Sequence, residues 1–267
     1  MQSAISILPS DERMEYLAGY ISKKGGKICH SYAEIDDSGY IICGVPFSKD
    51  GVLLNTSLDP HLPIDSFLGM LNSSHTIVGG NLPREVISYC TTHSIRYYDV
   101  LSSDDLSVKN ARLTAEGLLI PLLSETSFSI CDFKTLITGF GKCGKEIADI
   151  LSVFTDEIYI YDTDQKAIKS AKSRGFITIS KKEIHEKYNL FHEINTMINT
   201  VPDNPFTENT WRRLPEDCII FNIASVPLQP PVPFTHPVIS CPGIPGNYAP
   251  KTAGTLIAKE ICRHFNL

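Results

Sequence analysis

The apolar residues of this chain fall into short runs that alternate with amphipathic segments along most of the sequence. Residues 4–8 form one apolar run, and Leu17, Tyr20 and Ile21 in the next segment have the spacing of one helical face. Gly25 and Gly26 end this helix, and we expect a second short strand before Cys29. Because expected strands alternate with expected helices, the pattern predicts the α/β class and mostly parallel, doubly wound sheets.

The same pattern assigns further elements in both halves of the chain. In the first half, we expect strands at 40–45, 76–78 and 96–99, a helix at 83–93, and turns without a clear helix across 46–62. In the second half, we expect strands at 176–179, 196–200 and 218–223, helices at 165–174 and 209–214, and a helical stretch near 181–188. Two such arrays indicate two doubly wound parallel-sheet domains.

A long helix with regularly spaced leucines and alanines separates the two arrays, from about residue 102 to 126. We therefore divide the chain into an amino-terminal α/β domain (1–105), a linking helix (106–127), a second α/β domain (128–250) and a carboxyl-terminal helix (251–267). The apolar side of this last helix is short, and we expect it to return to the first domain.

The most specific motif is a glycine turn between an apolar strand and a helix within residues 135–162. Gly139 permits a tight turn, Gly141 allows backbone to approach a pyrophosphate, and Gly144 allows the helix to pack on the strand. The second strand ends at Asp162, where a carboxylate can accept hydrogen bonds from ribose hydroxyls. These parts predict a Rossmann dinucleotide-binding domain, with Phe140, Lys142 and Cys143 also in the cofactor site. Asp162 favours NAD over NADP, because it would repel a 2′-phosphate.

Three further segments lie where strands of such a sheet would end, at its ligand-binding edge. Thr200, Val201 and Pro202 could pass beside the cofactor, or form an ordinary strand end. Asn222 and Ser225 offer an amide and a hydroxyl to the nicotinamide carboxamide or to a substrate. The proline-rich segment 241–254 has a restricted backbone, and Lys251 and Thr252 at its end could meet an anion at a helix start.

Net charge and composition argue against several classes of partner and site. The net charge of −6 argues against nucleic acid and anionic membranes as main partners. No apolar run approaches the roughly 20 residues of a membrane span, and the amino terminus lacks a secretory signal. The eight cysteines are scattered without a C-x-x-C pair, and the histidines show no metal spacing. We therefore expect a reduced, cytoplasmic protein without disulfides or a metal site.

Three sequence blocks resemble the dipicolinate synthase A family, whose members help spore-forming bacteria to make pyridine-2,6-dicarboxylate. They are NARLTAEG at 110–117, the glycine turn with its flanks at 136–148, and CPGIPGNYAPKTAG at 241–254. The resemblance extends nearly end to end, although the first turn at 8–11 lacks the glycines usual in the family. It implies NAD(P)-linked oxidation of a dihydrodipicolinate-type precursor during sporulation, with a second, flavoprotein-like component, the B protein of dipicolinate synthase.

The resemblance also implies roles for individual residues on a small dicarboxylate substrate. Lys251, Thr252, Thr114 and Arg112 would bind its two carboxylates, and Glu116 would act as a base or orient a cation. Lys251, Thr114 and Glu116 are the candidate catalytic residues. The amino-terminal domain then lies on the substrate side of the reaction.

Two other functions stay open at this stage. A 2-hydroxyacid dehydrogenase would share the two-domain plan, but its chemistry needs a histidine–acid pair and an arginine that no motif here supplies. A non-catalytic NAD-binding component of a larger complex would fit as well, because no residue is an unambiguous acid or base. The sequence does not fix the oligomeric state, and a homo-oligomer is compatible with it.

Overall fold

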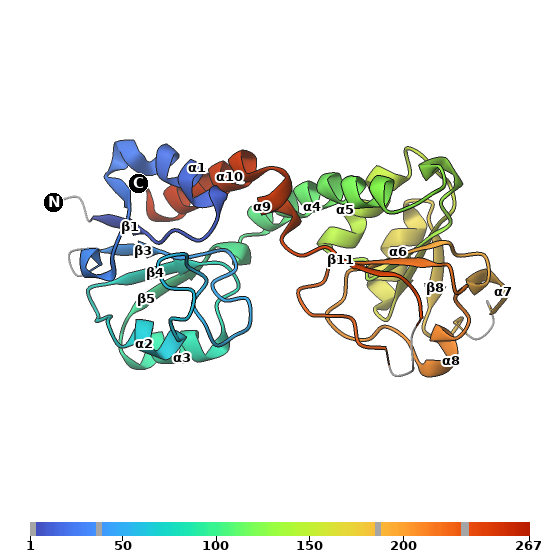
Figure 1. Cartoon of the computed structure of the whole chain (residues 1–267), viewed down its shortest axis with the longest axis horizontal. Helices are drawn as coiled ribbons and strands as arrows, with labels where there is room; N and C mark the ends of the chain where they lie inside the picture. The colour runs from blue at the N-terminus through green and yellow to red at the C-terminus, as the bar shows by residue number, and fades with distance from the viewer. Residues whose placement is uncertain (1–3, 36–38, 185–187, 231–234) are drawn as a thin grey trace. The chain divides into compact units, whose positions relative to one another are not determined.

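The structure is a computed structural model that describes residues 4–35, 39–184, 188–230 and 235–267. It forms two compact units. Unit 1 comprises Met1–Asn110 and Gly246–Leu267, and unit 2 comprises Ala111–Pro245. Each unit contains one sheet in which all strand pairs described are parallel, covered by helices (Figure 1). The predicted fold class, two parallel-sheet α/β domains, is confirmed.

The sheet of unit 1 has five strands in the order β2-β1-β3-β4-β5. Their bounds are β1 Ile5–Ile7, β2 Gly26–Ile28, β3 Tyr40–Ile42, β4 Thr76–Gly79 and β5 Arg96–Asp99. The helices are α1 Glu12–Ile21, α2 Ile64–Leu68, α3 Arg84–Thr92 and α10 Pro250–Phe265. In Figure 1, α1 and α10 cover one face of the sheet, and α2 and α3 cover the other.

Unit 1 has a hydrophobic core on each face of its sheet. Successive residues of a strand point to opposite faces, so alternate strand residues pack in alternate cores. Ile41 and Ile77 pack in the cluster that contains α2 and α3. Their neighbours Ile42 and Val78 pack in the cluster that contains α1 and α10. The continuous apolar runs in the sequence therefore reflect burial on both faces, as is usual for parallel strands.

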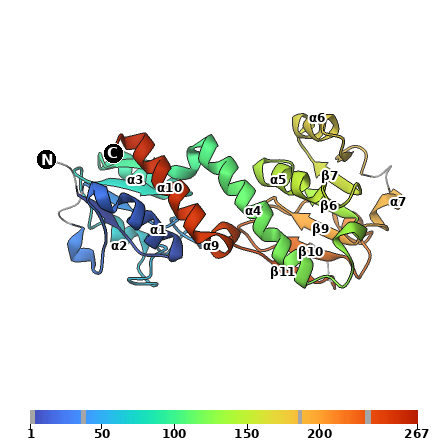
Figure 2. The same ribbon diagram turned by 90° about the horizontal axis from the view of Figure 1, so that it is seen from above.

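Helix α10 packs along α1, although the two lie at opposite ends of the chain (Figure 2). Gly254 makes this approach possible, because a Cβ atom there would lie 2.3 Å from the carbonyl oxygen of Arg13. Glu260 faces inward with only 4% exposure. It accepts hydrogen bonds from the Tyr98 hydroxyl at 2.5 Å and from Arg263 Nη2 at 2.7 Å.

Glu260 should make the stability of unit 1 depend on pH. Burial alone would raise its pKa, but the hydrogen bonds from Tyr98 and Arg263 outweigh burial and hold the pKa below its ordinary value of 4.5. A carboxylate with a lowered pKa contributes stability above its unfolded pKa and loses it as the pH falls through the folded pKa. In urea unfolding followed by circular dichroism, Glu260→Gln should therefore lower stability at neutral pH and flatten its decline below pH 4.5. An unchanged acid slope would contradict this assignment.

The sheet of unit 2 has six strands in the order β11-β10-β9-β6-β7-β8. The strands are β6 Thr135–Thr138, β7 Ile158–Asp162, β8 Ile177–Ser180, β9 Thr196–Asn199, β10 Ile219–Asn222 and β11 Val238–Ser240. The helices are α5 Lys142–Leu151, α6 Gln165–Ser173, α7 Tyr188–Phe191 and α8 Glu208–Trp211. Counted from β6, this is the 3-2-1-4-5-6 order of dinucleotide-binding folds. The order reverses between β6 and β9, where such folds bind their ligands.

Two helices contain residues of both units. Helix α4, Asp104–Ser124, starts in unit 1 and continues in unit 2, and α9, Ile244–Tyr248, lies where the chain returns to unit 1. In unit 2, Leu118 and Leu122 of α4 pack with Ile137 and Ile198 of the sheet. Short 3₁₀ helices occur at Ser22–Lys24, Tyr32–Glu34, Val100–Ser102 and Ile130–Asp132.

The sequence pattern missed three short elements and misplaced one. The helices α2 and α9 and the strand β11 have three to five residues each, too few for a periodic pattern. The helical stretch expected near 181–188 is wrong in its first part, because residues 181–184 form turns and α7 begins only at Tyr188. Residues 185–187 lie outside the described residues.

Candidate functional site

The glycine turn joins β6 to α5 at the point where the strand order of unit 2 reverses. Gly139 has φ of +90°, a region that favours glycine, and a Cβ there would lie 2.5 Å from Thr200 Oγ1. At Gly144 a Cβ would lie 2.0 Å from the Gly139 carbonyl oxygen. The protein itself therefore excludes any side chain at these two positions.

Gly141 is different, because a Cβ there would meet no protein atom within 4 Å. It is also the N-cap of α5, so no side chain covers the start of that helix. The first N–H groups of a helix have no acceptor within the helix and attract anions. A glycine that the protein's own packing does not require, at the helix start, fits a pyrophosphate that approaches the backbone there.

Gly144→Ala should destabilise unit 2, because the new methyl group overlaps the Gly139 carbonyl. We expect a loss of about 3 kcal/mol in the free energy of unfolding, the range for overpacking with backbone shifts. The chain's single tryptophan, Trp211, is buried in unit 2, so its fluorescence during urea unfolding reports on this unit. Gly19→Ala is the matched control: it lies in α1 with nothing near its Cβ position and should not destabilise the protein. Equal stability of both variants would contradict the packing role of Gly144.

Asp162 lies at the end of β7, the strand next to β6, and its carboxylate bonds the backbone of the glycine turn. Its Oδ2 accepts a hydrogen bond from the backbone N–H of Phe140 at 2.7 Å, and its Oδ1 accepts one from the N–H of Asp164 at 2.8 Å. A carboxylate has about four acceptor sites, so two bonds leave capacity for ribose hydroxyls. Phe140 is buried and packs edge-on against Phe176, with the rings 5.9 Å apart.

The predicted residues of α4 lie beside α5. Arg112 pairs with Glu116 through Nε at 3.1 Å and with Glu146 of α5 at 3.6 Å. Thr114 is buried and contacts the thiol of Cys143, which follows the first residue of α5. Burial raises the pKa of the Cys143 thiol, which disfavours the reactive thiolate form.

The two loops predicted beside the cofactor follow β9 and β10. Thr200 is half-buried, and its hydroxyl donates a hydrogen bond to the Thr138 carbonyl at 2.8 Å, while Pro202 is exposed. Asn222 is 2% exposed and its amide nitrogen donates to the Val226 carbonyl at 2.9 Å. Ser225 is exposed in the loop that this bond closes. The roles of these residues toward a ligand stay predictions.

Lys251 and Thr252 belong to unit 1, where they are exposed in the first turn of α10. The N-cap of this helix, Ala249, provides no side-chain hydrogen bond, and Pro250 occupies the first helical position. A cation, a hydroxyl and the helix start are therefore close in sequence and exposed together. This arrangement is suited to an anion such as a carboxylate.

Sequence reasoning gave no firm role to Arg13 and Asp11 at the start of α1. Arg13 is 8% exposed, bonds Asp11 Oδ2 at 2.6 Å and donates a hydrogen bond to the Val45 carbonyl. Burial alone would raise the pKa of Asp11, but Arg13 outweighs it and holds that pKa below its ordinary value. Gly246 packs on the same guanidinium, since a Cβ there would lie 2.8 Å from Arg13 Nε. The sequence feature that could have identified this pair is an aspartate at the start of a helix, followed two residues later by an arginine.

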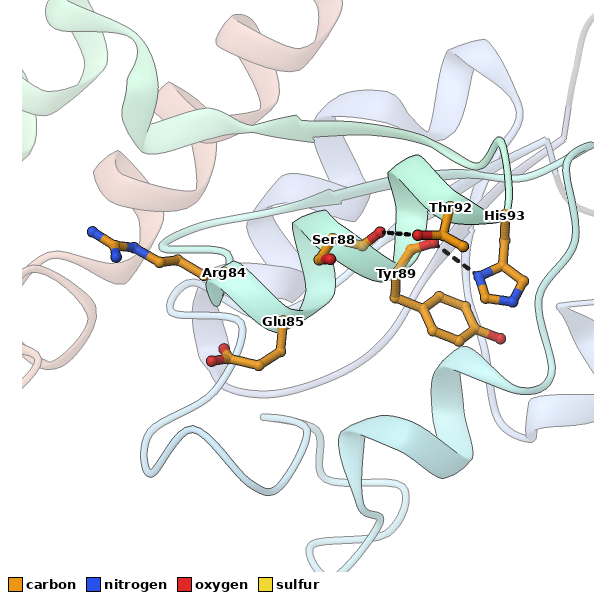
Figure 3. Close-up of a pocket in the computed structure, with 6 residues that line it drawn as sticks. All are labelled: Arg84, Glu85, Ser88, Tyr89, Thr92 and His93. Carbon is orange, nitrogen blue, oxygen red and sulfur yellow. Dashed lines mark hydrogen bonds between the residues drawn. The ribbon is translucent and has the colours of Figure 1, made fainter.

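A separate open hollow of about 540 Å³ lies on α3 of unit 1 (Figure 3). Its six lining residues are Arg84, Glu85, Ser88, Tyr89, Thr92 and His93. The Tyr89 and His93 rings stack 3.9 Å apart, and His93 Nδ1 lies 3.0 Å from the Tyr89 carbonyl oxygen. These contacts join residues four apart on one helix and bring no catalytic pair together.

Two other kinds of site do not occur in the part of the chain that the structure describes. Among the described residues, no three His, Cys, Asp or Glu side chains lie together as metal ligands would. None of the helices there combines the length and the apolar character needed to cross a bilayer.

No protein-family model matches this chain. Among curated proteins, it is similar to the dipicolinate synthase A protein of Bacillus subtilis (strain 168), with 22% identity over 164 residues. The aligned segment is 60% of this chain and 54% of the relative, so the match spans about half the length of that protein. The resemblance inferred from the sequence motifs is confirmed.

Solved structures share the fold over nearly the whole chain. The dipicolinate synthase A protein from Bacillus halodurans has a TM-score of 0.83 at 17% identity, with 100% of this chain and 99% of that chain covered. A cofactor (NAD⁺)-bound 3-phosphoglycerate dehydrogenase from Entamoeba histolytica has a TM-score of 0.59 at 14% identity, with 100% and 96% covered. At these identities the likeness establishes the shared fold alone.

Proposed function

We propose that unit 2 binds NAD at its glycine turn and that the chain is an NAD(P)-dependent oxidoreductase of the dipicolinate synthase A type. The observation that carries this proposal is the contrast among the three glycines. The protein's own packing excludes a side chain at Gly139 and Gly144, but it leaves space at Gly141, where a pyrophosphate would approach. Asp162 would accept hydrogen bonds from the ribose, which favours NAD over NADP.

The proposed substrate is a dihydrodipicolinate-type dianion, as the sequence likeness suggests. Bound NAD⁺ supplies the hydride acceptor: the substrate loses a hydride and a proton, and dipicolinate, NADH and H⁺ result. Lys251 and Thr252 would hold a carboxylate through charge and hydrogen bonds. Arg112 and Thr114 are the further groups proposed for the carboxylates, and Asn222 and Ser225 those for the nicotinamide side.

Glu116 is the proposed base, and it lies beside Arg112 on the same helix. Its carboxylate accepts a hydrogen bond from Arg112 at 3.1 Å and retains partial exposure. An ionised carboxylate can take the proton that the ring loses as it becomes aromatic. The sequence likeness to one named component of a multi-component enzyme leads us to propose a partner, the flavoprotein-like B protein.

The test is the formation of NADH, followed by its ultraviolet absorbance, when the fresh product of dihydrodipicolinate synthase is supplied. The assay is run with and without the B protein, and with NAD⁺ and NADP⁺ in parallel. NADH formation that requires this chain supports the proposal. Tight NAD binding without turnover, even with the B protein present, would show a non-catalytic cofactor-binding component instead.

A further inference from the structure

Three polar side chains lie in a row inside the sheet of unit 2, where apolar residues would ordinarily pack. They are Thr138, Asn199 and Asn222, with exposures of 0%, 1% and 2%. Each is the last residue of its strand, and they are register partners across β6, β9 and β10. The row therefore crosses the point where the strand order reverses, directly beneath the glycine turn.

Hydrogen bonds connect the row in one direction. The Thr138 hydroxyl donates to Asn199 Oδ1 at 2.7 Å. Asn199 Nδ2 donates to Asn222 Oδ1 at 2.8 Å and to the carbonyl of Val201 at 2.9 Å. Both hydrogens of the Asn199 amide are thus engaged, and reversing the amide would place its oxygen against two other acceptors. The network fixes the orientation of Asn199.

The bond to Val201 links this network to the glycine turn. A Cβ at Gly139 would lie 2.7 Å from Val201 Cγ1 and 2.5 Å from Thr200 Oγ1, so these two residues pack directly on the turn. The Thr200 N–H and hydroxyl also bond the Thr138 carbonyl, at 3.0 and 2.8 Å. Asn199 therefore holds the second loop of the site against the first.

We propose that Asn199 is a positioning residue whose buried amide sets the shape of the cofactor groove by fixing the loop 200–202 against the Gly139 turn. This inference rests on the proposed function, since it assigns the groove to NAD. A buried polar network costs desolvation that an apolar core would avoid, but when all its members are bonded it specifies one arrangement. Such a network is useful where two loops must keep a fixed separation.

Asn195 provides a matched control at the opposite end of the same strands. It directly precedes β9, accepts a hydrogen bond from the Lys134 N–H at 2.9 Å, and donates one to the Asp132 carbonyl at 2.9 Å. Asn195 Oδ1 also accepts a hydrogen bond from the Thr196 hydroxyl at 3.1 Å. Asn195→Leu therefore removes three side-chain hydrogen bonds, as Asn199→Leu does, but far from the carboxyl ends of the strands. Asn199→Leu removes the network with a side chain of similar size.

The experiment measures NAD⁺ affinity by calorimetry, together with hydrogen exchange at the Thr200 amide in the cofactor-free protein. Asn199→Leu should weaken NAD⁺ binding by about tenfold and speed exchange at Thr200. Asn195→Leu should lower the melting temperature and change neither quantity. If Asn199→Leu does not fold, the isosteric Thr138→Val removes one bond of the network and should shift both quantities by about threefold.

Unchanged affinity and exchange in the network variants would overturn the positioning role, as would equal losses in Asn195→Leu. Failure of the wild-type protein to bind NAD⁺ would instead refute the proposed function. The hydrogen-exchange measurement at Thr200 would then still decide whether Asn199 holds the loop, because it uses the protein without cofactor.

Discussion

Gly141→Val should abolish NAD⁺ binding and leave the protein folded. Apart from the chain neighbours, the structure places no protein atom within 4 Å of a Cβ at this position, so the protein has room for the start of the added side chain, which would then obstruct the approaching ligand. The φ of Gly141 is −74°, which any residue can adopt. We expect affinity to fall by about 100-fold or more, equivalent to about 3 kcal/mol. Calorimetry measures the affinity, and Trp211 fluorescence in urea checks the fold.

The control for this prediction is Gly19→Val, which adds the same side chain in α1 at a position with equally open surroundings. It should leave NAD⁺ affinity and stability close to those of the wild type. Undiminished NAD⁺ affinity in Gly141→Val would show that no pyrophosphate lies against this backbone. Unfolding of Gly141→Val would show that the open space is required by the protein itself.

Lys251→Ala should reduce turnover strongly and leave NAD⁺ affinity nearly intact. Lys251 is exposed in the first turn of α10, so its loss should cost the fold little. If its ammonium group binds a substrate carboxylate, kcat/KM should fall by about 100-fold, a typical loss for a charged group that orients substrate. The NADH assay measures turnover, and calorimetry with NAD⁺ provides the second readout.

Lys259→Ala is the matched control, because this lysine is exposed further along the same helix. It should retain wild-type kcat/KM. A variant Lys251→Ala that lost NAD⁺ binding as well would place this lysine on the cofactor rather than on the substrate. Wild-type kcat/KM in Lys251→Ala would remove it from the reaction altogether.

The glycine turn could be predicted from the sequence because each of its parts is local. Gly139, Gly141 and Gly144 have fixed spacing, and the strand, the helix and Asp162 follow within one strand–helix–strand segment. What the motif could not supply is the difference among the three glycines. At Gly139 that difference depends on Thr200 and Val201, which follow another strand, and at Gly144 it depends on the carbonyl group of Gly139.

The glycines of the carboxyl-terminal segment had no explanation in the sequence. Gly246 and Gly254 both pack on Arg13, a residue near the other end of the chain. A Cβ at Gly246 would meet its guanidinium, and a Cβ at Gly254 would meet its carbonyl oxygen. The sequence signal was a proline- and glycine-rich segment, which indicates a restricted backbone without showing its partner. Contacts between such distant positions follow from the fold alone.

Asn199 and Asn222 show a similar limit. The sequence drew attention to Asn222 as a polar group at a strand end and passed over Asn199 in the same position of the preceding strand. The structure bonds the two amides to each other across neighbouring strands. A polar residue at the last position of a buried strand was the available signal, but its partner depended on the strand order.

A crystal structure of the protein grown with NAD⁺ tests the proposed cofactor site most directly. We expect the pyrophosphate over Gly141 at the start of α5, and a ribose hydroxyl bonded to Asp162. A coenzyme bound elsewhere, or a glycine turn that stays empty at saturating NAD⁺, would contradict this expectation.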